Sequence, residues 1–467
     1  MRKGFTLLSL LLVCAFIMSA CAPTGPATQA PAAPVAPAAT QAPAAPAAPA
    51  ATTAPAAPAA PAATQPPAAA PQNVTLEFWT FSDYATDVGG GLMNTFISEF
   101  EAAHPGVKIN MTGKGGDDIN SGIIASATSN TIPDVFMSTT SEGSTFNQVK
   151  ALTNVYDNWM AMPDAYRKQF NPDMIAEVTP ADKTMLGMPF TGYSTFLYRN
   201  LTVLKKAGID PKAPITDWSV WMDQMKKIKA AGLAATPTFY NDWWDFTNIY
   251  SGAATPKEWG IDFANKTTMI SLDKYVQTVT FLEEAKKYGV NLGDQDQATT
   301  DMFIANKLAF IATGPWMNPT FLEAKKNSGL DYDYVLIPGA TADNKGGVKG
   351  TEFMGFAPNN KNFKLAWEFA TYICDEPQLE RWTKALARYN ANEVAMSKSS
   401  DPLLTITIDS AKSALLERPP HFTVAYPGNY YQELQDNLAR ITTGKYPSIL
   451  AGGKDLITQL NTIIAAQ

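Results

Sequence analysis

The apolar residues from about position 73 onward recur with two different periods. Val74, Leu76 and Phe78 alternate with polar neighbours, and this period of two predicts a β-strand. Over residues 92–100 the apolar side chains recur at helical spacing, which predicts a helix. Pro105 and the glycine after it end that helix. The folded part of the chain therefore begins with a strand followed by a helix.

The same two periods then repeat along the chain. Residues 107–111 alternate again, residues 113–116 form a glycine-rich turn, and apolar residues at helical spacing follow over 119–127. A short apolar strand, residues 134–137, comes after Pro133. The order strand, helix, strand, helix, strand is typical of a parallel sheet with crossover helices, so the predicted fold class is α/β.

Polar residues follow the first and third predicted strands. Ser82 and Asp83 lie in a predicted loop after the first strand, and Ser138 and Thr139 follow the third. Ligands of open α/β sheets bind outside the carboxyl ends of the strands. These four residues are therefore candidates for binding a ligand, although a solvated loop role explains each of them as well.

Composition narrows the function classes. Roughly 395 of the 467 residues follow position 72, a length that predicts two or three domains. The net charge is −7 and basic residues are interspersed with acidic ones, which argues against a nucleic-acid surface. The chain holds 10 Trp, 17 Tyr and 23 Phe, and such rings build cores but also stack on the apolar faces of sugars.

Few residues are available for metal binding or nucleophilic catalysis. Only Cys374 remains in the folded part, so no disulfide can form there. His104 and His421 are the two histidines of the sequence, too few for a zinc site or for most histidine-based triads. His104 precedes a predicted helix end and is interpreted as structural. We therefore expect no metal and no cofactor. Because no local pattern singles out a catalytic carboxylate pair either, we do not expect an enzyme.

The N-terminus has the pattern of an export signal. Arg2 and Lys3 precede the apolar run 7–17, which is too short to span a bilayer permanently. The sequence Met18-Ser19-Ala20-Cys21 then resembles the lipobox of bacterial lipoproteins, which implies cleavage after residue 20 and acylation of Cys21. The alternative is an ordinary signal peptide, residues 1–20, with a coincidental cysteine.

Residues 22–72 carry no charged side chain and repeat Pro-Ala-Ala with occasional Thr and Gln. Such a segment has too little apolar surface to offset the entropy of folding, and its prolines favour extended polyproline II. At about 3.1 Å per residue it reaches roughly 160 Å at most. We predict that residues 21–72 are a disordered tether between a lipid anchor and the folded part.

Several segments along the folded part together resemble one family, the extracellular solute-binding proteins of ABC importers, in particular the branch that binds sugars and oligosaccharides. The segments are 76–80, 100–109, 132–136, 187–190, 197–200, 204–211, 302–310, 314–316 and 366–369. Each is weakly specific, but together they cover nearly the whole folded part in order.

The resemblance implies a two-lobed α/β fold of the type II periplasmic-binding-protein class, each lobe a mostly parallel sheet flanked by helices. The implied crossings between lobes lie near Pro189, near Pro338-Gly339 and near Asn390. The first lobe would then comprise residues 73–188 and 341–390, and the second lobe residues 189–340 and 391–467. Closure of the lobes around a solute would favour the form that a permease recognises.

The resemblance also implies a set of ligand-binding residues. Trp316 matches a sugar-stacking aromatic of the family, the alternative being a buried core tryptophan. Trp243 and Trp244 offer a second aromatic face, of which at most one is expected to face the ligand. Further candidates, each with a polar group that suits a polyol, are Ser82, Asp83, Ser138, Thr139, Tyr193, Glu352 and Tyr426.

Three functions remain open from the sequence. The first is a lipid-anchored carbohydrate receptor of an ABC importer, outside the cytoplasm, with a mono- or oligosaccharide and the permease subunits as partners. It would act as a monomer, touching the membrane only through its lipid. The second is a binding protein for a polyamine, a peptide or another small organic solute. The third is a secreted glycoside hydrolase, for which no local pattern selects a carboxylate pair.

Overall fold

The computed structural model describes residues 73–236, 243–291, 296–417 and 429–466. The chain divides into two compact units, residues 1–67 and 68–467, and all described residues belong to the second. Within these residues, no helix is long and apolar enough to cross a membrane.

The predicted order of the first elements is confirmed. Residues 81–84 were expected to be a loop, but residues 82–85 form a short helix, α1. The elements are β1 (Val74–Phe81), α1 (Ser82–Ala85), α2 (Asp87–Ala103), β2 (Val107–Lys114), α3 (Gly116–Ser129) and β3 (Val135–Thr139). The strands β2 and β3 both pair with β1 in parallel, as the crossover pattern predicted.

These strands belong to a larger mixed sheet, in the order β13-β12-β3-β1-β2, with β4 paired to β12. The added strands are β4 (Met188–Ser194), β12 (Val348–Phe356) and β13 (Leu415–Leu416). The strand β12 runs antiparallel to both β3 and β4. Residues of β3, β4 and β12, which lie far apart in the sequence, are therefore side by side in this sheet.

A second sheet has the order β8-β5-β9, and both of its pairs are antiparallel. This differs from the mostly parallel sheet expected for each lobe. Its strands are β5 (Phe196–Asn200), β8 (Phe310–Thr313) and β9 (Tyr332–Val335), and α13 (Asn318–Ser328) connects the last two. The reason is topological: α13 carries the chain from one side of β5 to the other, so β8 and β9 run in the same direction with β5 inserted between them.

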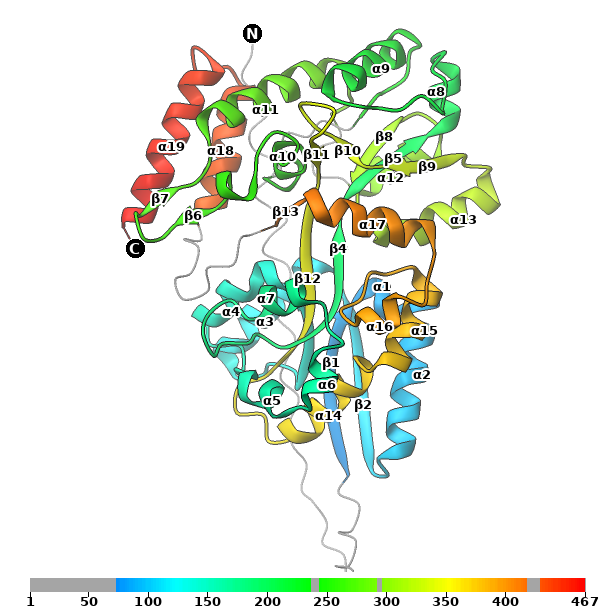
Figure 1. Ribbon diagram of the computed structural model, residues 1–467, viewed down its shortest axis with the longest axis vertical. Helices are drawn as coiled ribbons and strands as arrows, with labels where there is room; N and C mark the ends of the chain where they lie inside the picture. Colours follow the sequence, from blue (N-terminus) through cyan, green and yellow to red (C-terminus); the bar gives the residue numbers. More distant parts are fainter. Residues whose placement is uncertain (1–72, 237–242, 292–295, 418–428, 467) are drawn as a thin grey trace, which may run out of the picture. The chain divides into compact units, whose positions relative to one another are not determined.

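Two large groups of buried apolar side chains form the main cores. One draws on residues between 76 and 190 and between 353 and 395. The other draws on residues between 197 and 337 and between 415 and 464. The strand β4 leads into β5 and pairs with β12. The strands β4 and β12 therefore run from the first core to the second (Figure 1).

The remaining α-helices pack around these sheets and cores (Figure 1). They are α4 (Gly143–Gln148), α5 (Tyr156–Ala161), α6 (Asp164–Arg167), α7 (Pro172–Val178), α8 (Leu201–Lys206), α9 (Trp218–Ala230), α10 (Trp243–Tyr250), α11 (Leu272–Ala285), α12 (Asp296–Ile304), α14 (Phe363–Ile373), α15 (Glu376–Leu386), α16 (Glu393–Met396), α17 (Pro402–Ser413), α18 (Tyr430–Thr442) and α19 (Ile449–Ala465). There are also two short antiparallel strand pairs. They are β6 (Ile261–Asp262) with β7 (Thr267–Thr268), and β10 (Ile337–Pro338) with β11 (Lys345–Gly346).

The start of α9 offers a local test of stability. The carboxylate of Asp217 accepts hydrogen bonds from the backbone N–H groups of Ser219 and Val220 and from the Ser219 hydroxyl. The hydroxyls of Ser219 and Thr216 are the main groups that lower the pKa of Asp217, to about 2. Asp217 therefore fixes the N-terminus of a helix whose apolar face is buried in the second core.

Replacing Asp217 with alanine should lower the free energy of unfolding by about 1 kcal/mol, because the cap is lost. Asp217→Asn should keep most of the stability, since an amide oxygen can accept the same bonds. The folded pKa lies below the unfolded one, so the contribution of the charge is present above the unfolded value, about 3.9, and is lost as the pH falls through about 2. Urea unfolding of the two variants at neutral pH checks the cap, and equal losses would contradict it.

Candidate functional site

Three aromatic rings named from the sequence lie together where β4 leaves the large sheet. The ring centroids of Tyr193 and Trp316 are 6.0 Å apart, those of Tyr193 and Trp244 are 6.3 Å apart, and those of Trp244 and Trp316 are 6.4 Å apart. Tyr193 lies on β4, Trp244 in the first turn of α10, and Trp316 in a short 3₁₀ turn after β8. We call these three residues the aromatic triad.

The two adjacent tryptophans have different surroundings. Trp244 belongs to the aromatic triad, whereas the Trp243 ring packs against Tyr431 with centroids 4.9 Å apart. The two indoles meet edge to face at 6.2 Å. The structure therefore places Trp244 with Trp316 and uses Trp243 to join α10 to α18.

Trp316 is half-buried, unlike Trp221, Trp259 and Trp382, which are fully buried. Its ring lies over Gly314, where a β-carbon would come within 2.0 Å of a ring atom. The bare glycine therefore lets the indole lie flat against the backbone. A side chain that is held on one side and is not enclosed is suited to be a platform for a ligand rather than a core filler.

Tyr193 is held in place by a residue of β12 and by the residue that follows β13. Its phenol O–H donates a hydrogen bond to the carboxylate of Glu417, and its ring lies across Gly350. Burial is the main reason that the pKa of Tyr193 is raised well above its ordinary value, and the adjacent Glu417 adds to it. The phenol therefore stays protonated and orients its ring within the triad.

Replacing Gly350 with alanine should displace Tyr193, because the new methyl group would lie 2.4 Å from the phenol oxygen. We expect weaker solute binding and a loss of stability of about 1–3 kcal/mol from the overpacking. Gly116→Ala at the start of α3 is the matched control, since no atom lies within 4 Å of the place that its methyl group would take. Isothermal titration with the best solute and thermal melting measure both effects, and equal behaviour of the two variants would contradict this role of Gly350.

A buried polar cluster lies beside the aromatic triad. The Glu352 carboxylate accepts a 2.6 Å hydrogen bond from the Tyr84 phenol and another from the Thr191 hydroxyl. The guanidinium of Arg388 pairs with Asp83 and lies over the Tyr84 ring, 5.2 Å from its centroid. Glu352 and Asp83 were both predicted as ligand-binding residues, and here their described contacts are with protein groups.

Burial raises the pKa of Glu352, while the charge of Arg388 and the hydrogen bonds from Thr191 and Tyr84 oppose that rise. Arg388 is only 5% exposed and Glu352 only 7%. Arg388 thus pairs with the exposed carboxylate of Asp83, and its charge also favours the ionised form of the buried Glu352 carboxyl group.

Of the other predicted residues, Thr139 lies opposite Glu352 on the neighbouring strand β3, and Ser138 lies opposite Phe353. Ser82 is exposed at the start of α1, and Ser138 is fully buried, with its hydroxyl donating to the Asn120 side chain at 3.1 Å. The Thr139 and Ser141 hydroxyls lie 2.5 Å apart. Tyr426 and Cys21 lie outside the described residues.

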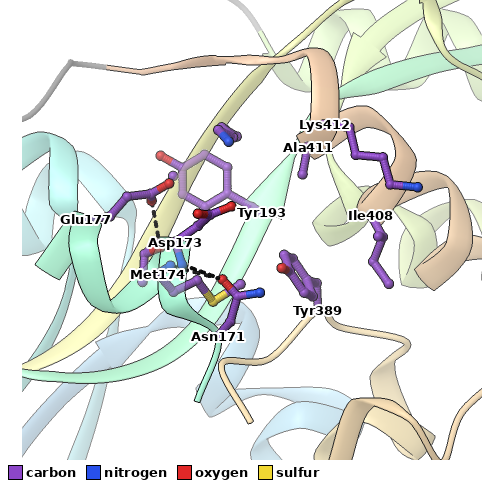
Figure 2. Close-up of a pocket in the computed structure, with 12 residues that line it drawn as sticks. Asn171, Asp173, Met174, Glu177, Tyr193, Tyr389, Ile408, Ala411 and Lys412 are labelled. Carbon is purple, nitrogen blue, oxygen red and sulfur yellow. Dashed lines mark hydrogen bonds between the residues drawn. The ribbon is translucent and has the colours of Figure 1, made fainter. Parts of the chain in front are cut away.

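A cavity of about 340 Å³ adjoins the triad at Tyr193 (Figure 2). Helices α7 and α17 and the strand β12 contribute most of its lining. Its charged and polar side chains are Asn171, Asp173, Glu177, Tyr193, Lys349, Thr351, Tyr389 and Lys412. Of these, only Tyr193 was predicted from the sequence.

The missed residues left weak signals in the sequence. Asn171 followed by Pro172 is a helix-start pattern, and the Asn171 side chain does cap α7 through the N–H groups of Asp173 and Met174. That pattern could have placed Glu177 on a short helix just before the crossing predicted near Pro189. Nothing in the sequence spacing indicates that α17, more than two hundred residues later, forms the facing wall.

The described residues contain no group of three or more His, Cys, Asp or Glu side chains that could hold a metal ion. Aromatic faces, hydroxyls and carboxylates at the junction of two sheets suit the binding of a small polar molecule. The fold and these residues together define a two-lobed α/β solute-binding protein.

The chain belongs to a family described as bacterial extracellular solute-binding proteins, whose model matches residues 95–405, more than half of the sequence. Among curated relatives it is similar to the sn-glycerol-3-phosphate-binding periplasmic protein UgpB of Escherichia coli (strain K12), with 26% identity over 240 residues. The match covers 49% of this chain and 54% of that protein. The chain thus spans about half the length of the curated relatives it matches.

Solved structures have the same fold. The GacH receptor of Streptomyces glaucescens GLA.O, described unliganded and with acarbose, matches with a TM-score of 0.70 and 16% identity over 84% of this chain and 98% of that one. The maltotriose-binding protein of Thermus thermophilus matches with a TM-score of 0.69 and 15% identity over 83% and 100%. A Thermotoga lettingae ABC transporter solute-binding protein with bound α-D-tagatose matches with a TM-score of 0.69 and 19% identity over 84% and 99%.

Proposed function

We propose that this protein captures a carbohydrate outside the cytoplasm and delivers it to an ABC importer. The observation that carries the proposal is the aromatic triad of Tyr193, Trp244 and Trp316, whose ring centroids lie 6.0 to 6.4 Å apart. Aromatic rings offer the apolar surface on which the C–H face of a sugar packs. The names of the similar structures, which refer to acarbose, maltotriose and tagatose, support the same solute class.

The mechanism that we propose is capture by closure. β4 and β12 run between the two cores, and residues that they carry, Tyr193 and Glu352, lie beside groups from both parts of the chain. A solute that contacts both parts binds a closed form better than an open one and so shifts the population towards it. Small-angle scattering should then show a smaller radius of gyration on saturation with solute.

A phosphorylated small molecule is the second candidate solute, because the curated relatives are named for binding sn-glycerol 3-phosphate. Phosphate recognition depends on cations and backbone N–H donors. Arg388, a buried cation beside the predicted residues, already pairs with Asp83. This existing ion pair favours the neutral carbohydrate.

The test is a thermal-shift screen over mono- and oligosaccharides, sn-glycerol 3-phosphate, polyamines, peptides and amino acids. A tight solute raises the melting temperature by mass action. A shift with a sugar that vanishes in Trp316→Ala supports the proposal, whereas a shift with sn-glycerol 3-phosphate alone would replace it with the second candidate. Incubation with oligosaccharides should yield no cleavage products, and their appearance would indicate a hydrolase.

We also propose that Cys21 carries a lipid anchor and that residues 22–72 tether the receptor to the cell membrane. If so, Cys21→Ser should release the protein from the membrane fraction without changing its melting temperature, because the anchor is the only membrane contact. Deleting residues 31–67 should leave the solute affinity unchanged. Fractionation and titration check both expectations, and membrane retention of the serine variant would exclude the anchor.

A further inference from the structure

The cavity beside Tyr193 holds a buried carboxylate with one oxygen available. Glu177, on α7, is only 9% exposed, and its Oε2 accepts a 2.7 Å hydrogen bond from the Thr351 hydroxyl. No contact within the described part of the chain occupies its Oε1. Burial raises the pKa of Glu177, whereas the Thr351 hydroxyl and the charge of Lys349 lower it. A buried carboxyl side chain is therefore held at the wall of a space that can admit a small molecule.

A cation lines the same cavity without pairing to that carboxylate. Lys349, on β12, is half-buried, and no ion pair or side-chain hydrogen bond joins its ammonium group to any described residue. Lys412, by contrast, is exposed and bonds to Asp409 at 2.7 Å. The cavity thus presents the Glu177 carboxyl group and the Lys349 ammonium group, which are close enough to influence each other but are not in contact. The exposed carboxylate of Asp173 also lines it.

The remaining walls suit a compact molecule of mixed polarity. Tyr389 faces the cavity from the opposite side to Glu177, and no described group bonds to its phenol (Figure 2). Met174, Ile408 and Ala411 add apolar surface. A volume of about 340 Å³ accommodates an amino acid but is small for an oligosaccharide.

We propose that this cavity binds a small zwitterion, a free α-amino acid or a betaine. Glu177 would contact its ammonium group, Lys349 its carboxylate, and the Tyr389 phenol would donate to the same carboxylate. Opposite charges at two places in one partly buried site are complementary to a molecule that carries both. A simple anion or a simple cation would satisfy only one wall and leave the other charge unpaired, which is costly away from water.

The site is separate from the aromatic triad, although Tyr193 borders both. The proposal therefore does not depend on carbohydrate binding. The elements α7, α17, β4 and β12 all line the cavity. Its ligand would therefore bind next to β4 and β12, the two strands that run between the cores.

The test is isothermal titration of the full chain with glycine, larger α-amino acids and glycine betaine, alongside acetate and methylammonium. We expect a saturable isotherm with one site for at least one zwitterion, and none for the two singly charged probes. Glu177→Gln and Lys349→Met should each weaken that binding at least tenfold. Lys205→Met, an exposed lysine paired with Asp331 elsewhere, should leave it unchanged.

Binding at the solute site is distinguished with Trp316→Ala, in which zwitterion binding should persist. Absence of a saturable isotherm for every zwitterion would overturn the proposal. Equal binding of acetate or methylammonium, or loss in Trp316→Ala with retention in Glu177→Gln and Lys349→Met, would overturn it as well. Thermal melting of each variant verifies that it is folded, and the two cavity variants give independent readings.

Discussion

Replacing Trp316 with alanine should raise the dissociation constant for the carbohydrate about ten- to hundredfold, a loss of about 1.5–3 kcal/mol of binding free energy. The indole is half-buried, rests on Gly314 and lies 6.0 Å from the Tyr193 ring, so its truncation removes one side of the aromatic triad. The melting temperature should change little, because the side chain is not enclosed in a core. Titration and melting of the same sample measure both quantities.

Trp221→Ala is the matched control for this prediction. Trp221 is fully buried in the second core, against Phe281 and Phe310. Its truncation should cost about 3–5 kcal/mol of folding stability. If Trp316→Ala behaves like Trp221→Ala, losing stability while its affinity is unchanged once folded, then Trp316 is a core residue and the proposed platform fails.

Replacing Arg388 with methionine should lower the free energy of unfolding by about 3–5 kcal/mol, because it leaves a buried carboxylate without its cation. Arg388 is 5% exposed, pairs with Asp83, and is the main charge that opposes the raised pKa of Glu352. The loss should be larger at alkaline than at acidic pH, because it is the charged form of Glu352 that needs the cation.

The sign of the pH dependence follows from the direction of the shift. A carboxyl whose folded pKa is raised holds its proton more tightly in the folded state than in the unfolded one. Stability from this group is therefore greatest below its unfolded pKa and declines as the pH rises through the folded pKa. Arg388→Met should raise the pKa of Glu352 further and extend that decline to higher pH.

Urea unfolding at pH 5 and pH 8 measures this effect, with Glu352→Gln and the double variant as controls. The added Glu352→Gln change should rescue part of the stability lost in Arg388→Met, since a neutral amide needs no cation. A loss that is equal at both pH values and is not rescued would show that Arg388 acts through packing alone.

Much of the fold could be predicted from local patterns. The alternation at Val74, Leu76 and Phe78 and the helical spacing over residues 92–100 correspond to β1 and α2, because each pattern places apolar groups on the side that packs. The loop expected at residues 81–84 is largely a helical turn instead, and its Tyr84 side chain is buried in the core, where it bonds Glu352. The direction of the strands in the second sheet depends on where α13 returns the chain, which no local pattern encodes.

The aromatic triad, too, was predicted in part from the sequence and decided in part by the tertiary structure. The sequence alone made Tyr193 and Trp316 candidates, through resemblance to a known family, and offered Trp243 and Trp244 as a second aromatic face. Which of the two adjacent tryptophans joins Trp316 was decided by the packing of α10, with Trp243 against Tyr431. Adjacent helical residues point in different directions, so only the orientation of the whole helix settles that choice.

The cavity was determined by the tertiary structure alone. Glu177, Lys349 and Tyr389 lie on a short helix, a strand and a loop far apart in sequence, and each looks like an ordinary surface residue by itself. They line one cavity only because of long-range pairing, above all that of β4 with β12. Periodicity records which side of an element is apolar, whereas the meeting of distant polar groups depends on topology and packing, which the sequence specifies only through the complete fold.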